Sequence, residues 1–441
     1  MTTTKNNEHN KLNFSSEREQ SQACLNSAEH EKNQGRKVLN VPNKREQNQT
    51  CSDSAEREGL SPKGNVPNLR FKEFQGEWEK CKLGDLTAKV GSGSTPKGGN
   101  AVYTSAGHCF VRSQNVGMGY LILDDVAHIN DGIHQKHKAT ELKEDDVLLN
   151  ITGASIGRTA IATKEIEGGN VNQHVCIIRA NSKVSPKFLC NYIQTKKIQN
   201  YIQSLQTGGS REGLNFEQIR SFPISLPNMA EQNKIAQLLD KLNERIATQN
   251  KIIDKLQSLI KGIRNDVFGK LRKNIGFNAV VGDVLDYEQP QSYIVEDTEY
   301  TNEGTPVLTA NKAFVLGYTL ETDGIYDNGD CIIFDDFTLD CKYVDFPFKV
   351  KSSAIKILTA KNKELLRYTF EFLKYLDLST EEHKRHYIAE TQNQEIILPT
   401  DQMVKTIAHI FSTLSLRMET AVKQRNVFEK QKQYLLRQMF I

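Results

Sequence analysis

The chain has 441 residues, of which 38% are hydrophobic and 25% are charged, and its formal net charge is +3. A chain of this length is too long to fold around one ordinary hydrophobic core, so two or more domains are expected. The opening residues are polar, and no run of about 18 apolar residues occurs. We therefore expect neither a membrane span nor a secretion signal, and we predict a cytoplasmic protein.

The cysteines and the distribution of charge further restrict the class of protein that this sequence can be. The eight cysteines form no C-x-x-C pair, which argues against a zinc cage or a disulfide framework and favours inert thiols. Charge is unevenly spread: residues 279–400 carry a net −11, whereas 229–278 carry +5 and 401–441 carry +4. An acidic segment thus lies between two basic ones.

The first 228 residues divide into a leader and a domain. Residues 1–66 are rich in Asn, Gln, Ser, Glu and Lys, a composition that buries too little apolar surface to fold, and we predict a disordered leader. Residues 67–228 have short apolar runs separated by Gly-rich turns, which predict strands at 108–113, 146–152 and 174–180. A helix with Pro near its start is predicted over 185–205.

The next segment, 229–276, has the pattern of one long helix. It follows the opening LPNMAEQNKIAQLLDKL (226–242), and ten positions alternate in spacings of four and three residues. Nine of the ten are apolar: Ile235, Leu239, Leu242, Ile246, Gln249, Ile253, Leu256, Ile260, Ile263 and Val267. The spacing predicts a coiled-coil seam on a helix about 60 Å long.

The second half of the chain repeats this order. Residues 277–400 predict strands at 305–310, 312–320, 331–336 and 352–358 and a helix at 362–376. LPTDQMVKTIAHIFSTL (398–414) then repeats the helix opening 172 positions later. In the helix predicted over 401–441, the equivalent seam positions are Ile407, Phe411, Leu414, Met418, Ala421, Arg425, Phe428, Lys432, Leu435 and Met439.

The repeat predicts an architecture. The chain reads as domain, long helix, domain, long helix, and the second helix can pack antiparallel along the first. Two globular domains would then lie at opposite ends of a rod in a pseudo-twofold arrangement. Two such domains at a fixed separation suit a split DNA site, whose halves lie on one face of the duplex about 34–36 Å apart.

Several stretches also carry a resemblance to a known family. PNLRFKEFQGEWEKCKLGDL (67–86), SGSTPKGG (92–99), EDDVLLNITGASIGRTAI (144–161), SREGLNFEQIRSFPISLP (210–227) and both Leu-Pro helices resemble the specificity subunit of type I restriction-modification enzymes. The resemblance covers 67–441. It implies an α+β fold of two mixed α/β target-recognition domains separated by two long helices that form an antiparallel coiled coil.

The same resemblance implies partners and a role. Each domain would read one half of a bipartite double-stranded DNA site, and the helices would dock two adenine methyltransferase subunits. Restriction and translocase subunits would join for ATP-dependent cleavage. The chain itself would be non-catalytic and hold no metal or cofactor, with S-adenosylmethionine, ATP and Mg on the partner subunits.

Polar and cationic loop residues are the candidates for DNA contact, because Arg reads guanine, Asn and Gln read adenine, and Lys and Ser mostly bind phosphates. In the first domain they are Ser94, Thr95, Lys97, Arg112, Ser113, Asn115, Ser210 and Arg211. In the second they are Asn311, Lys312, Tyr318, Lys342, Lys384 and Arg385. The acidic balance of the second domain argues against strong DNA binding by that domain alone.

Catalytic motifs are missing. No Asn-Pro-Pro-Tyr loop, dinucleotide fingerprint or phosphate-binding loop occurs. Asp335, Asp336, Asp340 and Lys342 superficially resemble a nuclease site, but we expect a solvated surface there. His134 and His137 have zinc-like spacing without a third ligand, which favours a surface turn.

One alternative stays open at this point. The same pattern suits a coiled-coil scaffold with two protein-binding domains and no role on DNA. Gel-shift binding to genomic fragments would separate the two, because a scaffold has no preference for a DNA sequence.

Overall fold

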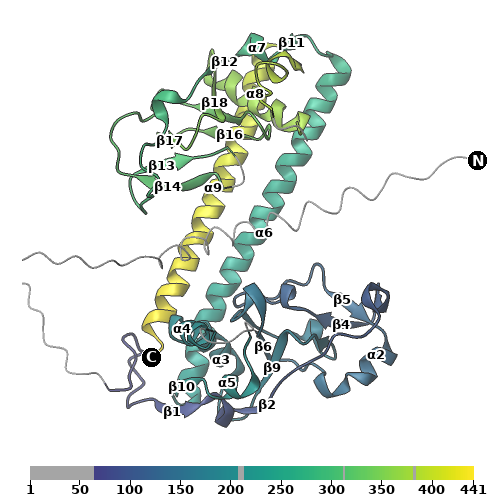
Figure 1. The fold of residues 1–441 in the computed structure, drawn as a ribbon, viewed down its shortest axis with the longest axis vertical. Helices are drawn as coiled ribbons and strands as arrows, with labels where there is room; N and C mark the ends of the chain where they lie inside the picture. The colour runs from purple at the N-terminus through teal and green to yellow at the C-terminus, as the bar shows by residue number, and fades with distance from the viewer. Residues whose placement is uncertain (1–63, 207–212, 311–312, 381–383) are drawn as a thin grey trace, which may run out of the picture. The chain divides into compact units, whose positions relative to one another are not determined.

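The computed structural model describes residues 64–206, 213–310, 313–380 and 384–441. The predicted leader, 1–66, thus lies almost wholly outside the described residues. The chain divides into an N-terminal unit, residues 54–253 and 420–441, and a C-terminal unit that includes 254–419. Two long helices, α6 (Met229–Asn274) and α9 (Asp401–Gln438), contribute to both units (Figure 1).

The N-terminal unit contains two four-stranded sheets, ordered β2-β9-β6-β7 and β3-β5-β4-β8. Neighbouring strands are antiparallel except β4 and β8, which are parallel. A separate antiparallel pair, β1 with β10, leads into α6. The strands are β1 (Glu79–Lys82), β2 (Thr87–Ser92), β3 (Tyr103–Thr104), β4 (His108–Val111), β5 (Ala127–Ile129), β6 (Val147–Asn150), β7 (Thr159–Ile161), β8 (Asn170–Val171), β9 (Val175–Ala180) and β10 (Pro223–Leu226).

The helices of this unit differ from the prediction at one place. The single helix expected over 185–205 is two helices, because the chain turns at Gln194 and Thr195. The Thr195 hydroxyl donates to the carbonyl of Tyr192 (2.7 Å) and accepts from the amide of Ile198, so it caps the second helix. The helices are α2 (Asp131–Lys136), α3 (Pro186–Ile193), α4 (Lys196–Ser204) and α5 (Phe216–Arg220).

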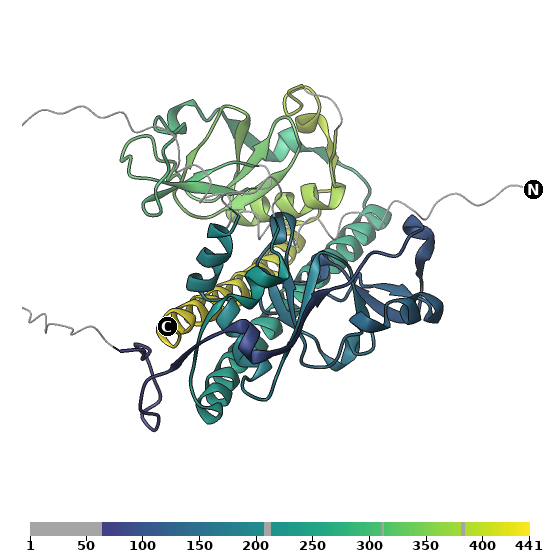
Figure 2. The same ribbon diagram turned by 60° about the horizontal axis from the view of Figure 1, so that its bottom comes forward.

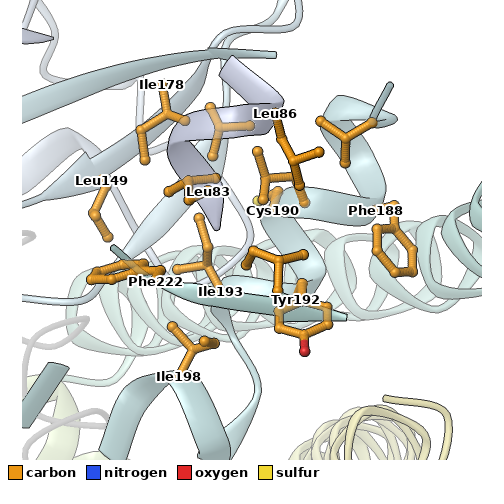
Figure 3. Packing of buried hydrophobic residues seen from close by; sticks show 14 of the residues in the cluster. Leu83, Leu86, Leu149, Ile178, Phe188, Cys190, Tyr192, Ile193, Ile198 and Phe222 are labelled. Carbon is orange, nitrogen blue, oxygen red and sulfur yellow. The ribbon is translucent and has the colours of Figure 1, made fainter. Parts of the chain in front are cut away.

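The core of the N-terminal unit lies between the sheet β2-β9-β6-β7 and the helices. Figure 3 shows Leu149 of the sheet close to Phe222 and to Ile193 of α3. Ile178 of the sheet and Tyr192 of α3 belong to the same cluster. The same cluster takes in Ile235, Ala236 and Leu239 of α6 and Leu436, Met439 and Phe440 at the end of α9. Removal of this apolar surface from water is what fixes both long helices to the domain.

The C-terminal unit is built in the same way. Its sheets are ordered β12-β18-β15-β16 and β14-β13-β17, and the pair β11 with β19 leads into α9. Helix α8 (Lys363–Leu376) packs on β15, β16 and β18. The remaining elements are β11 (Ala279–Val280), α7 (Val281–Val284), β12 (Leu285–Glu288), β13 (Thr305–Leu308), β14 (Val315–Thr319), β15 (Cys331–Asp335), β16 (Cys341–Val344), β17 (Lys349–Val350), β18 (Ile355–Ala360) and β19 (Glu395–Ile396).

Strand registers show that the two units repeat one scaffold. Leu148 of β6 pairs with Ile177 of β9, and Ile333 of β15 pairs with Ile357 of β18. Strands β9 and β18 therefore correspond residue for residue at an offset of 180. In both units the second sheet contains one parallel pair, β4 with β8 and β13 with β17.

Near one end of each long helix, a phenylalanine packs against aromatic rings of a domain helix, and the two arrangements are equivalent. Phe440, at the end of α9, packs against Phe188 and Tyr192 of α3 with ring centroids 5.2 and 5.5 Å apart. In the C-terminal unit, Phe268 near the end of α6 packs against Tyr368 and Phe372 of α8 at 5.5 and 5.1 Å. The phenylalanines are 172 positions apart, the offset of the helix repeat, and the α3 and α8 residues are 180 apart.

Each unit contains a part of both long helices. In the N-terminal unit, Arg245 of α6 lies over the ring of Phe428 of α9, and in the C-terminal unit Phe268 of α6 stacks on Phe411 of α9. All twenty predicted seam positions are buried or partly buried. Figure 2 shows the ribbons of both helices, teal for α6 and yellow for α9, from a second direction. The polar member Gln249 has a buried side-chain oxygen without a hydrogen-bond partner, and burial lowers the pKa of Lys432.

Candidate DNA-recognition site

Four loop segments meet at one edge of the N-terminal sheets. The amide of Ile151, after β6, donates to the carbonyl of His174, before β9 (3.0 Å), and the carbonyl of Ile151 accepts from Leu214 (2.9 Å). The amide of Gly93, after β2, donates to the carbonyl of Asn172 (3.2 Å). A Cβ at Gly93 would overlap the carbonyl oxygen of Val171, so glycine permits this close approach.

Side chains on these loops form a chain of hydrogen bonds. Thr152 Oγ1 contacts Nδ1 of His174 (2.5 Å), and Nε2 of His174 contacts Nε2 of Gln173 (3.1 Å). The Thr95 hydroxyl donates to Oε1 of Gln173. Nearby, Ser94 Oγ contacts Nδ1 of His137 (3.1 Å). Ser94 and Thr95, both predicted for DNA contact, are therefore exposed members of an ordered polar surface.

The other described candidates of this unit behave differently. Lys97 is exposed on the same loop as Thr95. Arg112 is partly buried, pairs with Asp125 (3.8 Å) and lies over the ring of Tyr103. Ser113 is partly buried, and its carbonyl accepts from Asn150 (2.8 Å).

Asn115 requires a correction. Its side chain is 1% exposed, accepts from the amide of Arg112 (2.9 Å) and donates to the carbonyl of Ile122 (2.9 Å). These bonds hold the 112–122 loop in shape, and the Asn115 side chain is buried within that loop, not exposed on its surface.

The C-terminal unit repeats the backbone geometry of the site. The amide of Asp336, after β15, donates to the carbonyl of Ala354, before β18 (2.9 Å), and the carbonyl of Asp336 accepts from His386 (3.0 Å). Asp336 thus stands where Ile151 stands in the N-terminal unit. Arg385, the residue before His386, donates to the carbonyl of Ser353 (3.3 Å) and holds the position equivalent to Gly213.

The predicted cations of the C-terminal unit are paired with acids. Lys342 lies 3.5 Å from Asp340, Lys384 lies 2.9 Å from Glu390, and Arg385 lies 3.6 Å from Asp336. Lys384 and Arg385 are exposed. Tyr318 is 37% exposed and lies in the other sheet, on β14. Four further candidates, Ser210, Arg211, Asn311 and Lys312, lie outside the described residues.

Two expectations about acids and histidines are wrong. Asp335 and Asp336 are 7% and 1% exposed, not part of a solvated surface, since Asp335 accepts backbone amides of its own turn and Asp336 accepts those of His386 and Tyr387. His134 is 2% exposed, not on a surface turn, and its Nδ1 contacts Asn170 (2.8 Å). Within the described ranges no cluster of three His, Cys, Asp or Glu residues could hold a metal.

Sequence reasoning missed three residues of the N-terminal surface: Thr152, Gln173 and His174. The signal was available for two of them, because Gln173 and His174 belong to the short polar break NQH that directly precedes the apolar strand β9. Polar residues at such a break lie at the sheet edge, where binding loops are common.

Comparison with known proteins defines the class. Residues 75–258 match the family described as type I restriction modification DNA specificity domain. The N-terminal unit contains most of this matched range, so that unit is similar to the domain that the family describes.

Similarity extends to particular proteins. The chain is 44% identical over 136 residues to the EcoR124I/EcoR124II specificity subunit of Escherichia coli, which is 29% of this chain and 34% of that protein. It is 22% identical over 210 residues to the putative MjaX specificity subunit of Methanocaldococcus jannaschii, 47% of this chain and 49% of that protein. The matches thus span about a third to a half of these relatives' lengths.

A solved structure shares the fold. The crystal structure of the S subunit of a type I restriction-modification system from M. genitalium superimposes with a TM-score of 0.61 at 15% identity, over 85% of this chain and 99% of that one. The resemblance seen in the sequence is confirmed: this chain is a relative of type I specificity subunits. Its relatives are named as specificity subunits, in agreement with the prediction of a non-catalytic chain. Among the described residues no helix is long and apolar enough to span a membrane.

Proposed function

We propose that this chain is the DNA sequence-recognition subunit of a type I restriction-modification complex, and that each unit reads one half of a bipartite site. The observation that carries the proposal is the repeated site: the hydrogen bonds of Ile151 with His174 and Leu214 recur as those of Asp336 with Ala354 and His386. One scaffold with different side chains at the same loops is what two independent half-site readers require.

The long helices are the proposed spacer between the readers. Their seams support an antiparallel coiled coil, because the start of α6 and the end of α9 pack in one unit, and the end of α6 and the start of α9 pack in the other. Such a rod would hold two target-recognition domains at its opposite ends, at a separation set by helix length.

The proposal includes partners. Two methyltransferase subunits would dock on the helices and modify adenine with S-adenosylmethionine, and restriction subunits would add ATP- and Mg-dependent cleavage. The complex would act in the cytoplasm. Because residues 279–400 carry a net −11, these partners would supply much of the charge that neutralises phosphates.

The test is methylation specificity. The chain, purified with its methyltransferase subunits, is offered a randomised DNA library, and methylated adenines are mapped. A bipartite motif is expected, and replacement of residues 77–225 by the matching domain of a relative should change one half of it. No sequence preference would favour the scaffold alternative, and a change in both halves would contradict independent readers.

A second measurement tests the spacer. Four residues inserted after Gln249 lengthen a helix by about 6 Å and add roughly one turn, so both half-sites should persist while the gap between them grows by nearly two base pairs. An unchanged gap would mean that the helices do not set the separation of the half-sites.

A further inference from the structure

Gln173 lies at the centre of the polar surface of the N-terminal unit. Its side chain is exposed, whereas His174 and Thr152 behind it are partly buried. The backbone beside it is fixed on two sides, because the amide of His174 donates to Oδ1 of Asn172 (3.0 Å) and its carbonyl accepts from Ile151 (3.0 Å). An exposed amide is therefore carried by a rigid piece of backbone.

The hydrogen bonds around Gln173 define which way its amide faces. Thr95 donates to Oε1, so the Nε2 atom is the one beside His174. That Nε2 donates to Nε2 of His174, which places the ring proton on Nδ1, where it is donated to Thr152 Oγ1 (2.5 Å). Donors and acceptors match along the whole chain from Thr95 to Thr152.

The amide keeps unused capacity in this arrangement. Oε1 has two lone pairs and Nε2 has two hydrogens, and the contacts with Thr95 and His174 use one of each. Within the part of the chain that the structure describes, one acceptor and one donor of this exposed amide remain without a partner. That pair matches the N6 donor and N7 acceptor of adenine in the major groove. Since the amide is already oriented, little side-chain entropy is lost on binding.

We propose that Gln173 reads one adenine of the first half-site, and that His174, Thr152 and Thr95 are positioning residues that orient its amide. This rests on the proposed function and goes further by naming the base and the residue. Gln173 is the specificity-determining residue at that position, and His174 acts through it.

The experiment uses the complex of this chain with its methyltransferase subunits and a randomised DNA library. Discrimination by one bidentate pair predicts that Gln173→Ala lowers the preference for adenine at a single position by a factor between about 5 and about 150. Gln173→Glu, which can only accept, should move the preference at that position to cytosine, whose N4 donates. Gln135→Ala, an exposed glutamine on α2, is the matched control and should change nothing.

The positioning role of His174 is tested by a separate variant. His174→Phe keeps a ring but removes both hydrogen bonds, and it should relax the same single position as Gln173→Ala. In the double variant the loss should equal that of Gln173→Ala alone, because His174 acts through Gln173. Additive losses would contradict this coupling. If His174→Phe lowers the melting temperature, Thr95→Val tests the orientation from the other side of the amide.

The outcomes separate the two proposals. A wild-type complex without any bipartite preference would overturn the proposed function itself. A wild-type complex with a bipartite motif that Gln173→Ala leaves intact at every position would overturn the assignment of Gln173 only. A uniform fall in methylation across all sequences would also overturn it, because a base reader affects one position.

Discussion

The two candidate sites share a backbone arrangement and differ in the chemistry of their side chains. In the N-terminal unit, Ile151 and Cys176 occupy positions at which the C-terminal unit has Asp336 and Lys356. Lys356 is 1% exposed, lies 3.4 Å from Asp336 and donates to Gln289 (2.8 Å). The N-terminal site is thus supported by apolar packing, and the C-terminal site by a buried ion pair.

The difference shows how one scaffold carries two chemically different surfaces. Backbone hydrogen bonds between loops recur in both units. Because these bonds do not depend on side-chain identity, the residues at the edge of the sheet can differ between the units. In the N-terminal unit, hydroxyl, amide and imidazole groups of Thr95, Thr152, Gln173 and His174 form the hydrogen-bonded part of the surface. At the equivalent loops of the C-terminal unit, Arg385 reaches Ser353 and pairs with Asp336. Each surface brings its own supporting residues.

Removal of the buried carboxylate should produce the largest effect. Asp336→Ala leaves Lys356 buried beside the amide of Gln289 and without the carboxylate, and it removes the side-chain acceptor of the Tyr387 amide and one of the two acceptors of the His386 amide. We expect a loss of about 3–5 kcal/mol in the stability of the C-terminal unit. Hydrogen exchange of β15 and β18 with the N-terminal strands as internal reference would measure it.

Two further variants sharpen this result. Asp336→Asn keeps an oxygen for the two amides while removing the charge, so an intermediate loss is expected. Asp345→Ala, at an exposed acid of the same unit, should cost less than about 0.5 kcal/mol. Equal losses at Asp336 and Asp345 would show that the buried pair contributes nothing.

The fold was largely predictable because local pattern determines it. The apolar runs that became β6, β9, β15 and β18 are short and bounded by turns, and the heptad spacing predicted which faces of α6 and α9 are buried. The break at Thr195 was missed because its cap competes with a continuous helical pattern over 185–205.

The site was less predictable because its partners are distant in sequence. His134 is hydrogen-bonded to Asn170, 36 positions away, and Asp336 pairs with Arg385, 49 positions away. Spacing within one segment contains no information about such contacts. For that reason the sequence did not indicate that Asn115 is buried and Gln173 exposed, although both are amides in loops.

The second prediction concerns charge at the two surfaces. Arg385 is half exposed, so its pair with Asp336 should contribute at most about 1 kcal/mol to stability. If the guanidinium neutralises one phosphate, Arg385→Ala should lower the slope of log K against log salt by about 0.9. Gln173→Ala, at a neutral group, should leave the slope unchanged. Filter binding of the complex between 50 and 200 mM salt, about the range over which such slopes are resolved, measures both. Equal slopes for the two variants would contradict the proposed difference in charge between the two surfaces.

The smallest effect concerns the thiols. Burial raises the pKa of Cys176 and Cys331 to about 12 and that of Cys190 and Cys341 to about 11, whereas Cys109 is only partly buried and its pKa is raised by burial and by the nearby Glu165. The thiolate is the reactive form, and its population falls about tenfold for each unit by which the pKa exceeds the pH. At pH 8 iodoacetamide should therefore label Cys109 before the four buried thiols.

This labelling also reports on the ion pair. A thiol pKa raised by folding adds stability below the ordinary thiol pKa, and that stability is lost as the pH rises above it, so at pH 8 protection reflects the folded state. Asp336→Ala should expose Cys331 and Cys341 to the reagent while Cys176 and Cys190 stay protected. Peptide mapping by mass spectrometry resolves the four sites. Labelling of all four thiols in that variant would mean that the two units do not unfold independently. The buried ion pair would then stabilise both units and not the C-terminal unit alone.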